Sequence, residues 1–310
     1  VAEIAYLKSE GTFPKSASIS ISGGQLSMAQ GFFDEVKVES VTIADSRLTN
    51  SLKLNQTEIS NLSIHNCKVG QKDDGTLSFD SCIIHNKFSL SGLTAHAVKL
   101  RNCKGDGKIE INKATLLTCN LIYNRVSQLE LSSGNLDYLK LTQNTEIENW
   151  LLQANTIRKA LVTYRNKGAL LHLDITTAVD VLIKQELLEY IQVSNHQAGD
   201  LHIIGHPTFA SKISMEHSDF SQLTLEGKTV QNISLHVVTA DLLKMRAHRL
   251  HGPLSISSSS ITDTHIEGES YAKITLDDSQ FENIRIWSAE VEQLLIDQVS
   301  ASVLNVTMTK

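Results

Sequence analysis

Aromatic residues and proline are scarce in this sequence. Phe, Trp and Tyr make up 5% of its 310 residues and there are 3 prolines, which is unusual for a compact β-sandwich or a TIM barrel. Hydrophobic residues at 41% and charged residues at 20% are nevertheless typical of a globular chain rather than a disordered one. Ser, Thr, Asn, Leu and Ile are abundant, as in repetitive β structure.

Long apolar runs and a basic excess are also missing. No apolar run approaches the ~20 residues of a membrane-spanning helix, and no secretory signal stands at the start. A net charge of −6 disfavours general electrostatic binding to nucleic acid or to an anionic membrane. We therefore expect neither direct nucleic-acid binding nor a membrane span. The chain begins with Val rather than Met, which indicates a processed or truncated N-terminus.

No cysteine pair has the spacing of a metal site. The four cysteines, Cys67, Cys82, Cys103 and Cys119, are 15, 21 and 16 residues apart and form no CxxC pair. This is neither a zinc-ligand spacing nor a dense disulfide framework. The simpler expectation is a reducing compartment, and hence a cytoplasmic protein, with no metal and no cofactor.

An apolar residue recurs every five residues in the C-terminal third. Counted in fives, with one slip at Gly252-Pro253, all 19 central positions are apolar. The chain's own hydrophobic content would supply about eight of them by chance. The central residues are Met215, Phe220, Leu225, Val230, Leu235, Ala240, Met245, Leu250, Ile256, Ile261, Ile266, Tyr271, Leu276, Phe281, Ile286, Val291, Ile296, Ala301 and Val306. No helix has a period of five.

A ten-residue unit underlies the five-residue count. Large residues such as Ile213, Leu223 and Ile233 stand two positions before alternate centres, and small residues such as Ser218 and Ala289 stand between them. Each apolar-polar-apolar step is a short strand with both apolar side chains on one face, and the next two residues turn the corner. Four steps make a square coil of about 20 residues, stacked at the strand spacing of ~4.8 Å. The predicted fold is an all-β, parallel β-helix (β-solenoid).

The N-terminal half repeats this step less strictly. Apolar pairs run in fives there as Leu52-x-Leu54, Thr57-x-Ile59, Leu62-x-Ile64 and Cys67-x-Val69, and later as Ala114-x-Leu116, Cys119-x-Leu121, Leu129-x-Leu131 and Leu139-x-Leu141. The cysteines fall on small inward positions, so we interpret them as buried packing residues.

Several pentads resemble the pentapeptide-repeat family, whose pattern is a small residue, Asp or Asn, Leu or Phe, and two variable positions. They are Gly134-Asn135-Leu136, Cys119-Asn120-Leu121, Ala240-Asp241-Leu242 and Ser218-Asp219-Phe220. The resemblance implies a right-handed quadrilateral β-helix and covers about two-thirds of the chain. Alternate pentads depart from the family pattern because they carry Ile or Leu where the family has Ala.

The five-residue count fails between 148 and 212. Residues Ala178 to Tyr190 are predicted to form an amphipathic helix there, with Thr177 near its start. We therefore expect four parts: an N-terminal cap or early coil over 1–35, a first solenoid segment over 36–147, an irregular, helical interruption over 148–212, and a second, most regular solenoid segment over 213–310. Because the chain stops in register, we expect its last coil to be capped by a partner or to continue in a longer protein, and homo-oligomers to form through solenoid ends.

Two histidines are the best candidates in the sequence for a pair of metal ligands. His65 and His85 lie 20 residues apart, so a 20-residue coil would stack them on one face beside Asn66 and Asn86. No carboxylate or cysteine joins them in the same register, which favours a surface ladder over a metal site.

The candidate partner-binding residues come from a basic stretch, an acidic stretch and one tryptophan. The basic stretch is 244–251 and should direct its arginines outward. The acidic stretch runs from Asp263 to Asp297 with a net charge of −7. Trp287 holds an outward position, which indicates a contact site. The candidates are Trp287, Asp277, Asp297, Glu282, Glu292, Arg246 and Arg249.

No arrangement in the sequence indicates catalysis. There is no P-loop, GxGxxG motif or nucleophile elbow, and no carboxylate pair in a groove-forming context. We expect a non-catalytic interaction or scaffold protein that binds a protein partner through its outer faces. One alternative, which the family resemblance implies, is a DNA mimic that inhibits or protects a DNA-processing enzyme. The other is a carbohydrate-active β-helix, secreted or from a phage, which a row of acids and bases along a groove would favour.

Overall fold

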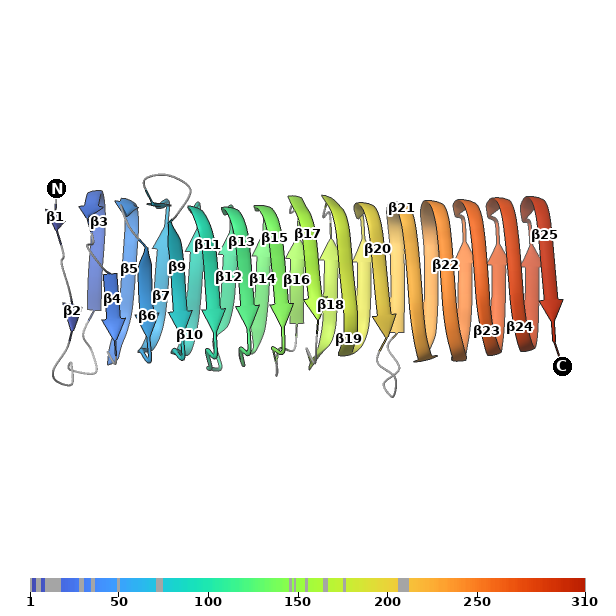
Figure 1. Ribbon diagram of the computed structural model, residues 1–310, viewed down its shortest axis with the longest axis horizontal. Coiled ribbons are helices and arrows are strands. Elements are labelled where there is room, and N and C mark those ends of the chain that lie inside the picture. The colour runs from blue at the N-terminus through green and yellow to red at the C-terminus, as the bar shows by residue number, and fades with distance from the viewer. Residues whose placement is uncertain are drawn as a thin grey trace. The chain divides into compact units, whose positions relative to one another are not determined.

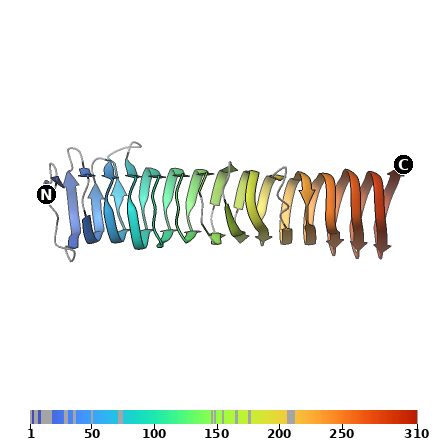
Figure 2. The ribbon, with the colours of Figure 1, turned by 90° about the horizontal axis from the view of Figure 1, so that it is seen from below.

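The structure, a computed structural model, describes residues 2–3, 7–8, 18–27, 31–34, 37–48, 51–70, 75–144, 147, 149–153, 156–163, 167–174, 177–205 and 212–309. These residues form a parallel β-solenoid of about 12 coils and contain no helix. None of their elements is therefore a helix long and apolar enough to cross a membrane. The chain divides into two compact units, Val1–Lys159 (unit 1) and Ala160–Lys310 (unit 2). Within each unit the strands lie side by side as successive turns of a coil (Figures 1 and 2).

Unit 1 is built from short strands. They are β1 (Ala2–Glu3), β2 (Leu7–Lys8), β3 (Ser18–Ser27), β4 (Gly31–Asp34), β5 (Lys37–Leu48), β6 (Leu52–Asn55), β7 (Glu58–His65), β8 (Lys68–Val69), β9 (Thr76–Asp80), β10 (Ile83–Ser91), β11 (Thr94–Arg101), β12 (Lys108–Asn112), β13 (Thr115–Ile122), β14 (Gln128–Ser132), β15 (Asn135–Thr142), β16 (Asn149–Gln153) and the start of β17 (Thr156–Thr163).

Unit 2 has longer strands, because many of its corners bend without interrupting the ladder. They are β18 (Lys167–Asp174), β19 (Thr177–Ser194), β20 (Gln197–Gly205), β21 (Lys212–Val230), β22 (Asn232–Ser257), β23 (Ser260–Asp277), β24 (Gln280–Asp297) and β25 (Ser300–Met308).

Successive coils stack as parallel strands in register. In unit 2, β23 pairs with β24, and Ser260 is the register partner of Gln280. In unit 1, β10 pairs with β12, and Lys87 is the register partner of Lys108. The predicted coil of about 20 residues is therefore confirmed. One coil of unit 1 is longer, because Lys87 also pairs with Asn61, which lies further back along the chain than one ordinary coil.

The five-residue register forms the core of unit 2. The first 15 of its 19 central residues, from Met215 to Ile286, are buried. The last four lie in the final coil, where Ile296 and Val306 are 42% and 38% exposed. Ile296 lies in the part of β24 on which no described coil stacks, and Val306 lies in β25, which pairs with β24 along one edge and has no described coil on its other edge.

One corner of the unit 2 coil is made by residues in the left-handed backbone conformation. Their φ angles are 44° to 52°. They are Asn195, His217, Val237, Ser258, Asp278 and Gln298. The residue after each of them turns inward, and several are serines. The N–H of Ser259 donates to Oγ of Ser279 (3.1 Å), whose hydroxyl donates to the Asp277 carbonyl (2.7 Å). These serines therefore satisfy buried backbone groups from coil to coil.

Asparagine and cysteine occupy equivalent inward positions in unit 1. Oδ1 of Asn144 accepts from the N–H of Asn124 (2.9 Å) and from its side-chain amide (3.0 Å), and Oδ1 of Asn124 accepts from the N–H of Cys103 (3.0 Å). All four cysteines are buried and free, as the register predicts for packing residues. Burial raises the pKa of the Cys119 thiol to about 12.

The predicted helix over 178–190 is wrong, because these residues lie in strand β19. β19 pairs in parallel with β18 and β20 and continues the solenoid of unit 2. Its inward residues include Ala178, Val181, Leu188 and Ile191. The spacings between them imitate the 3.6-residue period of an amphipathic helix, although corners between short strands produce them.

A histidine that the sequence analysis did not single out is buried in the unit 2 core. His196 follows the left-handed Asn195 and has no exposed surface. Its ring lies 5.8 Å from the ring of Phe220, and neither ring nitrogen has a hydrogen-bond partner among the described residues. Burial lowers the pKa of His196 to about 4 from the 6.5 of an exposed histidine.

The stability of the fold should therefore depend on pH through His196. The unfolded chain binds a proton near pH 6.5 and the folded chain near pH 4, so stability is fully present above about pH 6.5 and falls as the pH drops toward 4. The loss is on the order of 3 kcal/mol. We expect the His196→Val variant to lose this dependence, because Val238 already occupies the equivalent inward position of another coil. Urea unfolding between pH 7 and pH 4 measures it, and an equal pH dependence in both proteins would contradict it.

Candidate functional site

The acidic candidates do not form a continuous row. Asp277 and Asp297 are register partners in adjacent coils and therefore stack on one side of the coil. Glu282 and Glu292 are exposed, but they lie one and three five-residue steps after Asp277 and therefore on other sides of the coil. The acids of this stretch are thus distributed around unit 2.

The predicted histidine ladder does not form. His65 pairs in register with Ser91, because the coil between them is longer than the predicted one. His85 instead lies 3.1 Å from Oε1 of Glu58 through Nε2. Lys37 and His85 beside Glu58 hold the pKa of that carboxyl below its ordinary value. No group of three or more His, Cys, Asp or Glu side chains that could hold a metal ion occurs in the described part of the chain.

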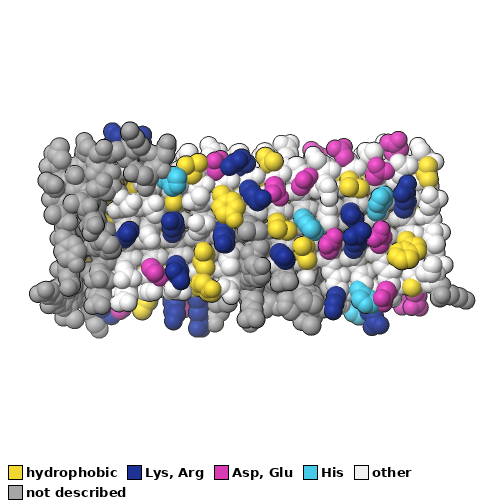
Figure 3. Space-filling view, in the orientation of Figure 1, with side chains coloured by type: hydrophobic (Ala, Val, Ile, Leu, Met, Phe, Trp, Pro, Cys, Tyr) yellow, Lys and Arg dark blue, Asp and Glu magenta, His cyan; other side chains and the backbone are white. Residues whose placement is uncertain are grey.

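The candidate functional site is a shallow groove along one edge of unit 2, which we call the edge groove. Its volume is about 460 Å³. It is lined by Gly227, Arg246, Ala247, His248, Glu267, Gly268, Glu269, Trp287, Ala289 and Thr309. Figure 3 shows this face, where two rows of charged side chains run along the C-terminal part of the chain with a pale strip between them.

The floor of the edge groove is a column of small residues. Gly227, Ala247, Gly268 and Ser288 are register partners in four successive coils. Ser288 is buried, whereas Ala289, predicted to hold the small inward position, is exposed. The inward position at this corner therefore lies one residue earlier than the sequence pattern indicates.

The Ala247 carbonyl and the Tyr271 side chain together explain why floor residue 268 is glycine. The Tyr271 side chain fills the interior, and its hydroxyl donates to the carbonyl of Glu267 (2.7 Å). A Cβ atom on Gly268 would lie 2.1 Å from the Ala247 carbonyl oxygen and 2.7 Å from Cε2 of Tyr271. Burial raises the pKa of the Tyr271 hydroxyl, so this group is a fixed donor.

The first wall of the groove is a column that ends in tryptophan. Glu226, Arg246, Glu267 and Trp287 are register partners in successive coils. Nε of Arg246 donates to Oε2 of Glu267 (2.9 Å). Trp287 is 55% exposed, so its predicted outward position is confirmed. The column therefore presents an ion pair beside an accessible indole.

The second wall carries a histidine–carboxylate pair and further charges at its margin. Nδ1 of His248 lies 2.8 Å from Oε2 of Glu269. Beyond this wall, Arg249, Ser270 and Glu290 are register partners in three successive coils. Arg249 and Glu290 are exposed and, within the described residues, neither has an ion-pair partner. The wall can thus offer charges of both signs to a ligand.

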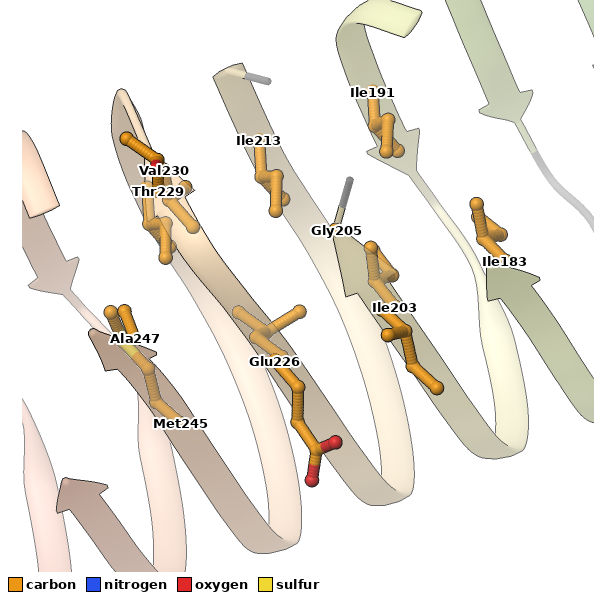
Figure 4. A pocket seen from close by; sticks show the side chains of 13 residues that line it. Ile183, Ile191, Ile203, Gly205, Ile213, Glu226, Thr229, Val230, Met245 and Ala247 are labelled. Carbon is orange, nitrogen blue, oxygen red and sulfur yellow. The ribbon is translucent and has the colours of Figure 1, made fainter. Parts of the chain in front are cut away.

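A second cavity lies inside unit 2 and has a different character. Its volume is about 20 Å³, which suits about one water molecule. Figure 4 shows its lining, mainly aliphatic side chains that include Ile183, Ile203 and Ile213. The carboxylate of Glu226 lies 3.7 Å from Nε2 of His202. We interpret this space as a packing defect of the core.

Of the candidates named from the sequence, Arg246 and Trp287 line the groove, and the four acidic candidates do not. The groove itself was missed. Its signal was present as small residues at 227, 247, 268 and 288, which recur once in each coil. Without the structure, these residues could not be distinguished from corner glycines and serines elsewhere in the repeat.

Gly268→Ala should destabilise unit 2 by about 2 kcal/mol, because the added methyl group meets a carbonyl oxygen and the Tyr271 ring. Gly227→Ala is the matched control, because its Cβ atom would come no closer than 3.3 Å to Cγ2 of Val230 and 3.7 Å to Cα of Gly205. Urea unfolding of both variants measures the difference. Equal stability of the two variants would contradict the proposed packing.

No protein-family model matches the sequence, and neither a curated protein nor a solved structure matches it with significance.

Proposed function

We propose that the protein is a non-catalytic interaction scaffold that binds a protein partner through the face of unit 2 that carries the edge groove. The observation that carries the proposal is the exposure of Trp287, a large apolar side chain 55% accessible in the same column as Arg246 and Glu267. Tryptophan and arginine dominate the energetics of protein interfaces. Trp287 and Arg246 line the same groove.

The backbone beneath the groove favours this role. Apart from Thr309, its lining residues come from strands β21 to β24, which pair with one another in register over the coils concerned. A surface that is ordered before binding loses little conformational entropy on association. The four free thiols are consistent with a reducing compartment, so we propose that the protein acts in the cytoplasm.

The acidic residues give little support to DNA mimicry. A mimic of duplex DNA needs rows of negative charge that follow a phosphate backbone. Here Asp277, Glu282 and Glu292 lie on three different sides of the coil. Unit 2 is acidic, with 11 lysines and arginines against 18 acids, but the distribution of this charge favours a mixed protein interface.

Trp287→Ala should weaken binding of the partner about 30-fold or more, because a central tryptophan contributes roughly 2 kcal/mol or more to an interface. Leu117→Ala is the control, since Leu117 is 40% exposed in unit 1, outside the groove. The partner is first captured by cross-linking and identified, and its affinity for each variant is then measured by calorimetry. An unchanged Kd for Trp287→Ala would refute the proposed face.

A carbohydrate-active function is the second candidate. Arg246, Glu267 and Glu269 line the groove with the acids and bases that this function would need, and the exposed indole of Trp287 belongs to the same lining. Carboxylate and guanidinium groups bind sugar hydroxyls, and an exposed aromatic ring stacks on the sugar's apolar face.

This second candidate predicts that polysaccharides bind to the edge groove or release reducing ends when incubated with the protein. Glu267→Gln and Glu269→Gln should then abolish the activity, since they remove the carboxylates on the two walls. Reducing-end assays and affinity electrophoresis measure the two outcomes. A protein that neither binds nor cleaves any tested polysaccharide eliminates this candidate.

A further inference from the structure

The charges on the second wall of the edge groove and along its margin are separated by sign along unit 2. Lys228 and Arg249 come from two successive coils, and Glu269 and Glu290 come from the next two. Arg249 and Glu290 stand in one column with Ser270 between them. The margin of the groove is therefore basic at one end and acidic at the other.

These charges are available to a ligand. Lys228, Arg249 and Glu290 are exposed and have no ion-pair partner within the described parts of the chain. Glu269 contacts His248, a pair that is charged on both sides only when the histidine is protonated. On the first wall, by contrast, Arg246 pairs with Glu267, and the remaining carboxylate, Glu226, lies 3.7 Å from Nε2 of His202. The exposed charges without an ion-pair partner on which this inference rests therefore lie along the second wall and its margin.

We infer that the edge groove takes an extended segment of a partner protein that carries one acidic and one basic side chain, with the basic side chain at the Trp287 end. This inference rests on the proposed function and names the chemistry of its partner. The acidic side chain pairs with Lys228 and Arg249. The basic side chain pairs with Glu269 and Glu290 and lies against the exposed indole, to which a cation is attracted.

The coil spacing sets the distance between the two side chains of the segment. Arg249 and Glu290 are two coils apart, which corresponds to about 10 Å at the spacing of stacked strands. An extended chain rises about 3.3 Å per residue, so this distance spans roughly three residues. The floor of Gly227, Ala247 and Gly268 leaves room for the main chain of the segment.

Intrinsic fluorescence offers a direct readout. The protein has 2 tryptophans, of which Trp150 is 1% exposed and Trp287 is 55% exposed. A ligand in the edge groove covers Trp287 and shifts its emission to shorter wavelength, while Trp150 gives a constant background. The probes are capped hexapeptides: Ser-Asp-Ser-Ser-Arg-Ser, the same peptide with Arg at both charged positions, and the same peptide with Asp at both.

The bipolar peptide should give a saturable blue shift and bind about fivefold more tightly than either like-charged peptide, because each exposed ion pair contributes up to about 1 kcal/mol. Equal or tighter binding of the peptide with two arginines overturns the inference, because the groove would then be a simple acidic patch. The absence of any shift up to about 10 mM peptide also overturns it. A shift produced by neutral oligosaccharides in place of the peptides would assign the groove to saccharides and overturn it as well.

A charge reversal provides the matched control. Glu290→Lys should weaken the bipolar peptide about fivefold, whereas Glu282→Lys, an equal change to an exposed acid on another side of β24, should have no effect. Glu290→Lys and Trp287→Ala together distinguish failure of this inference from failure of the proposed function. If Trp287→Ala weakens binding of the identified partner but Glu290→Lys leaves its affinity unchanged, the bipolar inference fails and the scaffold function stands. If Trp287→Ala leaves the partner's affinity unchanged, the proposed function fails.

Discussion

The structure of each unit depends on the in-register stacking of short coils of nearly constant length. Every strand pairs in parallel with its equivalents in neighbouring coils, so each inward side chain rests on its register partner in the next coil. A shift of one residue would turn the buried side chains outward and break the ladders of Asn124, Ser259 and Ser279 at the same time. The side-chain pattern can therefore vary little from coil to coil, and the few positions that depart from it are informative.

The edge groove is one such departure, and it follows from the packing at one corner of the coil. There the Ala247 carbonyl and the Tyr271 side chain leave no room for a Cβ atom on Gly268. The register partners of this position in the neighbouring coils are also small residues, namely Gly227, Ala247 and Ser288. Small side chains project little from this corner, so the side chains of the two flanking columns stand higher and form the walls of the groove. The indole of Trp287 lies in one of these columns. The core thus determines the shape of the surface that we propose as the binding site.

Much of the fold could be predicted from the sequence, because burial alternates with a period that no helix shares. The core from Met215 to Ile286, the coil length and the outward position of Trp287 follow from this period. β19 could not be predicted, since inward residues on either side of a corner fall at helical spacings. The stacking of His65 on His85 failed because a longer coil intervenes. The groove was missed because its floor depends on how Tyr271 packs, which the period of the repeat does not encode. The handedness of the coil and its association through solenoid ends stay predictions.

The most direct test of this account is a distance between Thr177 and Gln197. They are exposed register partners of β19 and β20 in the segment whose pattern imitates a helix. Nitroxide spin labels at the two positions should show strong dipolar broadening, because adjacent strands lie about 5 Å apart. An absence of broadening would show that the coils do not stack through this segment, and it would remove the constraint on which the account of unit 2 rests.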